Sequence, residues 1–149
     1  MMLNRSRMIV IASMTASLCF GGIPINTVAE SVSPDCRFES GPCSKTLLGI
    51  TMTLDITPKP LRPMRELTFT VLISDQGRPI TDAFVTIALT MPSMFMGKNI
   101  IMLAHSKDGI YEGKGVIVRC PSGEKIWKAT VTLKRDGGTA AANYVFEVP

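Results

Sequence analysis

The feature that most constrains how this chain folds is a series of short segments in which apolar and polar residues alternate. Residues 50–56 (ITMTLDI) and 67–71 (LTFTV) alternate without a slip. A period of two gives a β-strand one face for the core and one face for water. The same alternation, or a short apolar run, recurs in five further segments: residues 83–91, 99–104, 110–118, 125–133 and 143–148.

Clusters of turn-forming residues separate these segments. Three prolines fall within residues 58–63, and residues 75–79 (DQGRP), 106–109 (SKDG) and 136–138 (DGG) are rich in the residue types that turns prefer. No segment beyond the N-terminal region shows a helical period. Short strands with a turn about every ten residues predict an all-β fold, an immunoglobulin-like antiparallel β-sandwich of about seven strands. A small open barrel is the alternative with the same spacing.

The N-terminal residues have the layout of an export signal. Arg5 and Arg7 precede a mostly apolar stretch, residues 8–25, and the small residue Ala29 follows at a plausible cleavage site. We therefore interpret residues 1–29 as a signal peptide. An uncleaved N-terminal anchor is the alternative, although the apolar stretch is interrupted and is short for a span of about 20 residues. A lipidated Cys19 is a third option, but the preceding residue is Leu18 rather than a small one.

The remaining chain suits one small domain rather than a large enzyme. Residues 30–46 are polar and contain Ser, Pro and Gly, which predicts an irregular segment before a β-sandwich domain at residues 47–149. Without Arg5 and Arg7 the formal net charge falls from +4 to +2, which is too small to favour nucleic acid as a partner.

The sequence also lacks the marks of catalysis. His105 is the one histidine, and no nucleophile elbow, phosphate loop or carboxylate pair is recognisable around it. We expect neither an enzyme nor a small-molecule substrate.

Three cysteines remain after Cys19 is removed with the signal: Cys36, Cys43 and Cys120. In an oxidising compartment a disulfide is expected, and an odd number leaves one thiol over. We predict a bridge from Cys43 to Cys120, with Cys36 as the alternative partner of Cys120. Closing a loop of about 75 residues would add about 4 kcal/mol to the free energy of unfolding. The spare thiol is buried, paired between molecules, or a metal ligand.

Residues 91–99 (MPSMFMGKN) place three methionines within six residues at a strand end and in the loop that follows. Thioethers bind soft cations such as Cu(I). We predict Met94 and Met96 as the main donors and Met91 as the third. His105 is an accessory candidate that is out of reach if it lies at the far end of the next strand. The alternative is core packing, because Met91 is in phase with the buried face of its strand.

These segments carry a family resemblance. The patterns M-P-x-M-x-M-G-x-N (91–99), G-x-Y-E-G-K-G-V (109–116), C-P-S-G (120–123) and x-W-x-A-x-V (126–131) resemble the small exported YtkA-like domains, whose relatives include the FixH-type accessory proteins of cytochrome oxidase assembly. The resemblance covers roughly residues 47–148. It implies an immunoglobulin-like sandwich and copper handling in the bacterial envelope, in the periplasm or on the outer face of the cytoplasmic membrane.

Two functions follow as hypotheses. The first is a non-enzymatic envelope protein that binds or delivers copper, as Cu(I), through the methionine loop. The second is an interaction module without metal, in which the same loop is an adaptable apolar contact that docks on an envelope transporter or an oxidase assembly factor.

Overall fold

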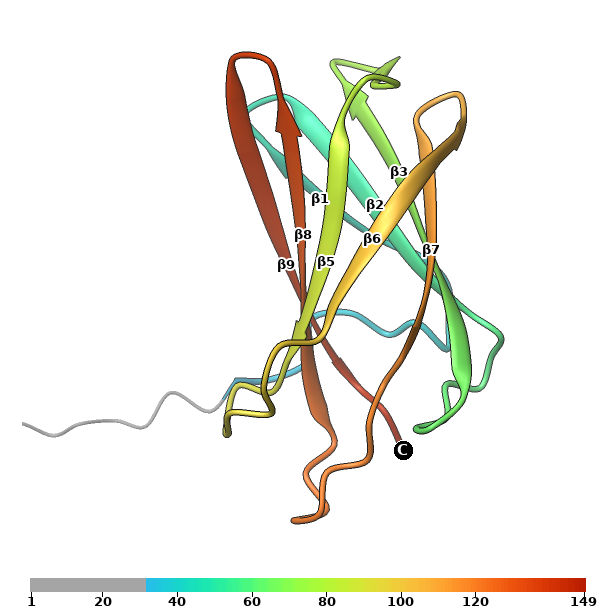
Figure 1. The fold of residues 1–149 in the computed structure, drawn as a ribbon, viewed down its shortest axis with the longest axis vertical. Helices are drawn as coiled ribbons and strands as arrows, with labels where there is room; N and C mark the ends of the chain where they lie inside the picture. The colour runs from blue at the N-terminus through green and yellow to red at the C-terminus, as the bar shows by residue number, and fades with distance from the viewer. Residues whose placement is uncertain (1–31) are drawn as a thin grey trace, which may run out of the picture. The chain divides into compact units, whose positions relative to one another are not determined.

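The computed structural model describes residues 32–149, so the signal peptide or anchor predicted at residues 1–29 lies outside the described residues. Within residues 32–149 every regular element is a strand (Figure 1). The strands are β1 (Cys43–Leu47), β2 (Ile50–Thr57), β3 (Glu66–Asp75), β4 (Arg78–Pro79), β5 (Phe84–Thr90), β6 (Ile100–Lys107), β7 (Ile110–Val116), β8 (Ile126–Arg135) and β9 (Gly138–Glu147). No helix in this part of the chain could cross a membrane.

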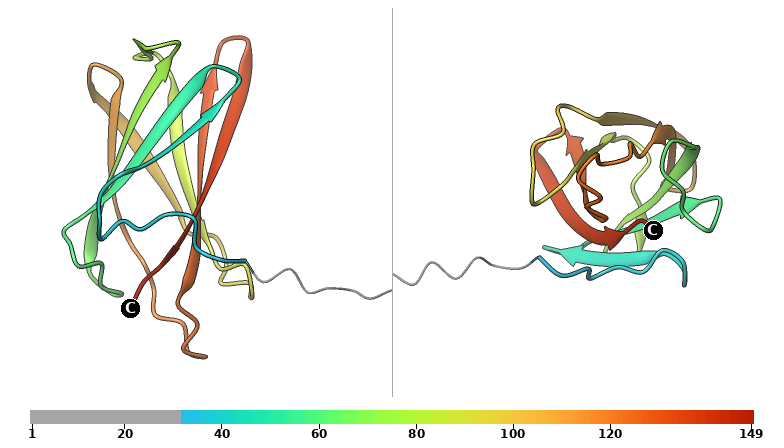
Figure 2. Two further views of the ribbon diagram at one scale, coloured as in Figure 1. Left: turned by 180° about the vertical axis from the view of Figure 1, so that it is seen from behind. Right: turned by 90° about the horizontal axis from the view of Figure 1, so that it is seen from below.

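All strand pairs are antiparallel, and the strand order is β1-β2-β3-β7-β6-β5-β8-β9, with β4 paired to β3. The strands form two layers: β1, β2, β3, β4 and β7 make up one, and β5, β8 and β9 make up the other. Strand β6 belongs to both layers. Its first half pairs with β5, its second half pairs with β7, and a bulge lies between His105 and Lys107. The two end strands of the order, β1 and β9, lie side by side (Figure 2).

This arrangement confirms the predicted all-β antiparallel, immunoglobulin-like fold. The two layers are not separate sheets, however, because β6 joins them along one side and the sheet almost closes into a barrel. The predicted irregular segment 30–46 is also too long, since residues 43–46 already belong to β1.

Period-two burial accounts for the core. Met52, Leu54 and Ile56 of β2 are fully buried, while the residues between them are only partly buried. The largest fully buried side chains include Trp127 and Tyr111, as expected for core residues. The Tyr111 hydroxyl donates to Ile80 O and accepts from the Ala83 amide, both at 3.1 Å, so the polar end of this ring is satisfied inside the core.

Two glycines of β7, Gly113 and Gly115, allow a close approach of β6. A Cβ atom on Gly113 would lie 2.7 Å from the carbonyl oxygen of Met102 on β6, which is too close for any side chain. Gly113 therefore allows β6 to cross over β7 at the point where the two layers join.

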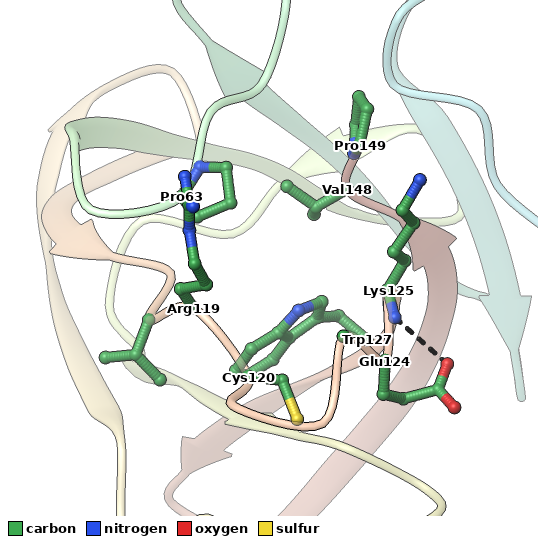
Figure 3. A pocket seen from close by; sticks show the side chains of 10 residues that line it. Pro63, Arg119, Cys120, Glu124, Lys125, Trp127, Val148 and Pro149 are labelled. Carbon is green, nitrogen blue, oxygen red and sulfur yellow. Dashed lines mark hydrogen bonds between the residues drawn. The ribbon is translucent and has the colours of Figure 1, made fainter.

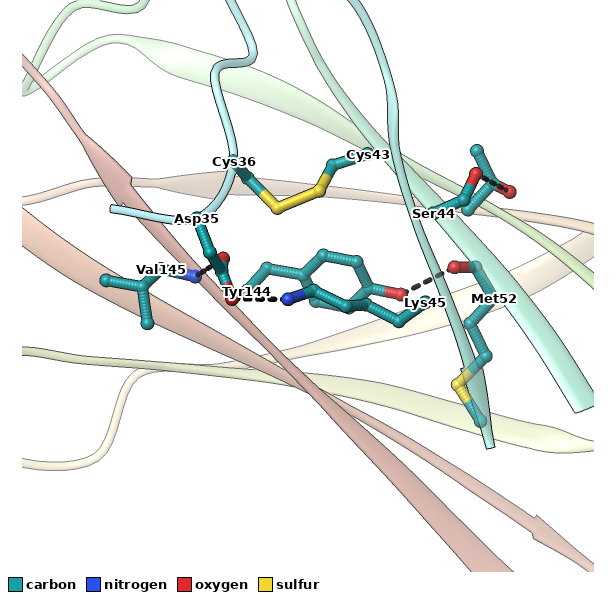
Figure 4. Close-up of a disulfide and its surroundings, with 9 residues drawn as sticks. Asp35, Cys36, Cys43, Ser44, Lys45, Met52, Tyr144 and Val145 are labelled. Atoms are coloured by element: carbon teal, nitrogen blue, oxygen red, sulfur yellow. Dashed lines mark hydrogen bonds and ion pairs between the residues drawn. A yellow bond between two sulfur atoms is a disulfide. The ribbon is translucent and has the colours of Figure 1, made fainter. Parts of the chain in front are cut away.

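The predicted Cys43–Cys120 disulfide is wrong. The structure joins Cys36 to Cys43, with Cα atoms 5.8 Å apart (Figure 4). Cys120 is free and buried. The reason is local. The amides of Asp35 and Cys36 both donate to Val145 O on β9 at 2.9 Å, and a turn over residues 37–41 then reverses the chain so that Cys43 meets Cys36.

The observed disulfide stabilises the folded state less than the predicted one would. A bridge between residues seven apart closes a short loop and contributes about 2–3 kcal/mol, less than the long loop predicted from sequence. We expect the double variant Cys36→Ser/Cys43→Ser to lose about that much free energy of unfolding in denaturant titrations, with Cys120→Ser as the control that retains the bridge. Peptide mass mapping without reduction should recover a 36–43 link. A link that contains Cys120 would contradict the structure.

Candidate metal centre

Three loops and the last residues of the chain gather at one end of the domain, the lower end in Figure 1. They are the β2–β3 loop (residues 58–65), the β5–β6 loop (residues 91–99) and the β7–β8 loop (residues 117–125). The methionine segment is the second of these loops. The donor groups that this segment can meet therefore depend on the side chains of the β7–β8 loop.

The structure gives the three methionines different surroundings. Met91 is 4% exposed and belongs to the hydrophobic core, in phase with the buried residues of β5, as the core-packing alternative predicts. Met94 is 37% exposed, and its amide donates to Met91 O at 3.4 Å, which folds the loop back on itself. Met96 is partly buried against the core, in a pocket that Leu89 and Trp127 also line.

Met94 meets a sulfur from the neighbouring loop. The Cys120 thiol donates to Met94 Sδ across 3.0 Å, and the Ser122 hydroxyl lies 3.0 Å from Cys120 Sγ and 3.8 Å from Met94 Sδ. A thiol, a thioether and a hydroxyl thus converge at one point between two loops. The soft sulfur donors of this group come from segments 26 residues apart in the sequence.

The β7–β8 loop holds this thiol in place through a tight turn. The Gly123 amide donates to Cys120 O at 3.1 Å, and Gly123 has a φ of 77°, a conformation that favours glycine. The turn comprises the C-P-S-G segment, residues 120–123. It brings Ser122 back onto Cys120, and the hydrogen bond from the Ser122 hydroxyl lowers the pKa of the Cys120 thiol below its usual value, against the opposing effect of burial.

Cys120 also lines a pocket of about 270 Å³ (Figure 3). Its other lining residues include Trp127 and Arg119. Trp127 lines the Met96 pocket as well, so the same indole is part of both the pocket that contains Cys120 and the pocket that contains Met96. This tryptophan is the one in the sequence, which makes it a specific optical reporter for the site.

The structure does not bring His105 to this end. It lies in the second half of β6 with its ring 5.2 Å from that of Tyr111, next to the β6–β7 turn. It lies five positions along the strand from Ile100, a distance of about 16 Å. His105 is therefore out of reach of a metal bound at Met94, the outcome foreseen for a far-end position. Within residues 32–149 no group of three or more His, Cys, Asp or Glu side chains is placed to hold a metal ion.

Comparison with known proteins adds little. No family model matches the chain, and no curated protein matches it. Among solved structures, the GAE domain of GGA2p from Saccharomyces cerevisiae is similar over 73% of this chain and 97% of that domain, with 13% sequence identity and a TM-score of 0.34. A likeness of this size carries no argument about family or function.

The different surroundings of Met91 and Met94 predict different costs of truncation. Met91→Ala should lower the free energy of unfolding by about 2–5 kcal/mol, because it leaves a cavity in the core. Met94→Ala should change it by less than about 1 kcal/mol, because that side chain is partly exposed. Chemical denaturation of the two variants beside the parent measures both. Equal costs would mean that the loop packs differently from the structure.

Proposed function

We propose that this chain is a non-enzymatic, exported protein that binds Cu(I) and passes it on, with Cys120 and Met94 as its principal ligands. The observation that supports the proposal is the 3.0 Å contact between Cys120 Sγ and Met94 Sδ at the loop end of the domain. The proposal agrees with the resemblance to YtkA-like envelope domains, and it places the protein in the bacterial periplasm or on the outer face of the cytoplasmic membrane.

The donor chemistry favours a soft monovalent ion. Thiolate and thioether sulfur bind Cu(I) well and bind hard ions such as Mg²⁺ or Ca²⁺ poorly. The Cys120 thiolate would supply the negative charge, and Met94 would supply a neutral second donor. Met96 lies two residues further along the same loop and is the candidate third donor. Met91 is buried in the core and supports the loop rather than binding the ion.

The site is also placed for transfer. Met94 is 37% exposed and Phe95 beside it is 89% exposed, so the ligand loop is open to an incoming partner. A partner protein could approach from this side and take the ion by replacing one sulfur at a time. Because thioethers are neutral and bind more weakly than thiolates, Met94 would leave first.

One observation favours the interaction module as a second candidate. Phe95 is a large aromatic side chain with almost its whole surface in water, next to the partly exposed Met94. Apolar residues grouped in this way mark contact surfaces for other proteins. In this alternative the loop docks on an envelope membrane protein without metal, and the contact between Cys120 and Met94 only stiffens it.

Copper titration separates the two candidates. With ascorbate as a mild reductant and a cuprous chelator as competitor, the folded residues 30–149 should bind one equivalent of Cu(I) and quench the fluorescence of Trp127. Met94→Leu and Cys120→Ser should each weaken binding by roughly tenfold or more, that is by at least about 1.4 kcal/mol. Met102→Leu is the matched control, because Met102 is 68% exposed on β6 and away from the site. Unchanged affinity in both site variants, or no stoichiometric binding by the parent, would leave the interaction module as the better candidate.

The thiol also predicts a pH dependence. Cu(I) must displace the Cys120 proton, so below the thiol pKa the apparent affinity should fall about tenfold per pH unit. A thioether carries no proton in this range, so Cys120→Met should bind more weakly but without this slope. Ser122→Ala removes the hydrogen bond that lowers the Cys120 pKa, so its decline should begin at higher pH than in the parent. A flat profile for the parent between pH 4 and 8 would exclude Cys120 as a ligand.

A further inference from the structure

A second, basic pocket opens beside the sulfur site at the same end of the domain. Its volume is about 440 Å³, and the side chains that line it belong to the β2–β3 loop, the β7–β8 loop and the last residue. Three of them are arginines: Arg62, Arg65 and Arg119. Arg119 and Pro63 line both this pocket and the one that contains Cys120, so the two are adjacent.

These arginines have no acidic partner among residues 32–149. The ion pairs in that part of the chain involve other cations: Lys45, Lys59, Lys114 and Arg135. Three guanidinium groups around one concavity repel each other and are charged at every physiological pH. Glu39 also lies at this loop, where its carboxylate accepts from the Leu61 amide, but the three arginines outnumber it. The pocket therefore has an excess of positive charge that an anion would offset.

The backbone, rather than any attraction between the arginines, holds them together. Leu61 is 1% exposed, and its amide donates to Glu39 Oε1 at 2.8 Å. The Met64 amide donates to Ile117 O, also at 2.8 Å, which ties the β2–β3 loop to the segment that leads into Arg119. Arg62 lies beside the first anchor and Arg65 beside the second. The backbone positions from which the three exposed arginine side chains project are thus fixed before any ligand arrives, which favours a binding site.

We propose that the pocket of Arg62, Arg65 and Arg119 binds a phosphate-type oxyanion. The planar guanidinium group donates two parallel hydrogen bonds to such an anion, and several of them around one pocket match its several oxygens. This proposal is independent of copper binding, because it uses none of the sulfur ligands.

The same chemistry is offered by a soluble phosphate or by the headgroup of an anionic lipid. Two exposed apolar side chains lie at this end: Met64, 63% exposed between Arg62 and Arg65, and Phe95, 89% exposed. A lipid surface would use them, since they could enter the headgroup region while the arginines bind phosphate. A soluble phosphate would not need them.

The first arm of the test uses inorganic phosphate, titrated by calorimetry at constant ionic strength. Replacing Arg62, Arg65 or Arg119 singly by Gln should weaken binding roughly tenfold, and replacing all three should abolish it. The matched control replaces Arg78, Lys107 and Lys134 by Gln. These exposed cations lie near the turns at the opposite end, so the control loses the same net charge. It should bind phosphate like the parent, and thermal melting checks that every variant folds.

The second arm uses vesicles of phosphatidylcholine with or without 30 mol% phosphatidylglycerol. Co-sedimentation that requires the anionic lipid, the three arginines, and Met64 and Phe95 would identify a lipid headgroup as the source. Phosphate binding that is indifferent to Met64→Ser/Phe95→Ser would identify a soluble anion. The proposal is overturned if neither probe binds, or if the control triple variant loses as much binding as the arginine triple variant.

Discussion

The position of β6 is the constraint on which the rest of the structure depends. Because β6 pairs with β5 along its first half and with β7 along its second half, it joins the two layers and makes β5 and β7 its neighbours on either side. Both β5 and β7 run antiparallel to β6, so the loops that follow them emerge at the same end of the domain. Met94 lies four residues beyond the end of β5 and Cys120 four residues beyond the end of β7. The contact between their sulfurs is a consequence of this pairing.

Local pattern predicts the strands well and the closure of the sheet poorly. The segments 50–56 and 67–71 are recognisable because one face of each is buried, so that apolar and polar residues alternate along the sequence. Strand β1 was missed because it lies at the edge of the sheet and has no fully buried residue, so its composition resembles that of a loop. The dual pairing of β6 depends on contacts between distant segments. The one local sign of it is the pair of small residues, Gly113 and Gly115, which is compatible with a close approach but does not identify what approaches.

The site was predicted in its parts but not in its pairing. The spacing of the methionines identified the loop, and the phase of β5 predicted that Met91 could be buried instead. The odd number of cysteines predicted a spare thiol, but the sequence analysis assigned Cys120 to the disulfide with Cys43 and estimated the contribution of the long loop that this bridge would close. Loop entropy measures what a bridge contributes once formed and does not choose its partners. That choice followed from a turn at residues 37–41 and from backbone hydrogen bonds to β9, neither of which has a distinctive sequence pattern.

The neighbouring charges bear on which ion the sulfur site would select. A Cu(I) ion bound by one thiolate is neutral overall, so it gains no repulsion from the arginine pocket beside it. A divalent ion on the same thiolate keeps a net positive charge, and Arg119 next to Cys120 would disfavour it. Ligand softness and local electrostatics therefore act in the same direction, toward a monovalent soft cation. An anion bound in the arginine pocket would weaken the electrostatic effect and leave the effect of ligand softness unchanged. Anion binding would therefore change the affinity of the sulfur site most for divalent metals and least for Cu(I).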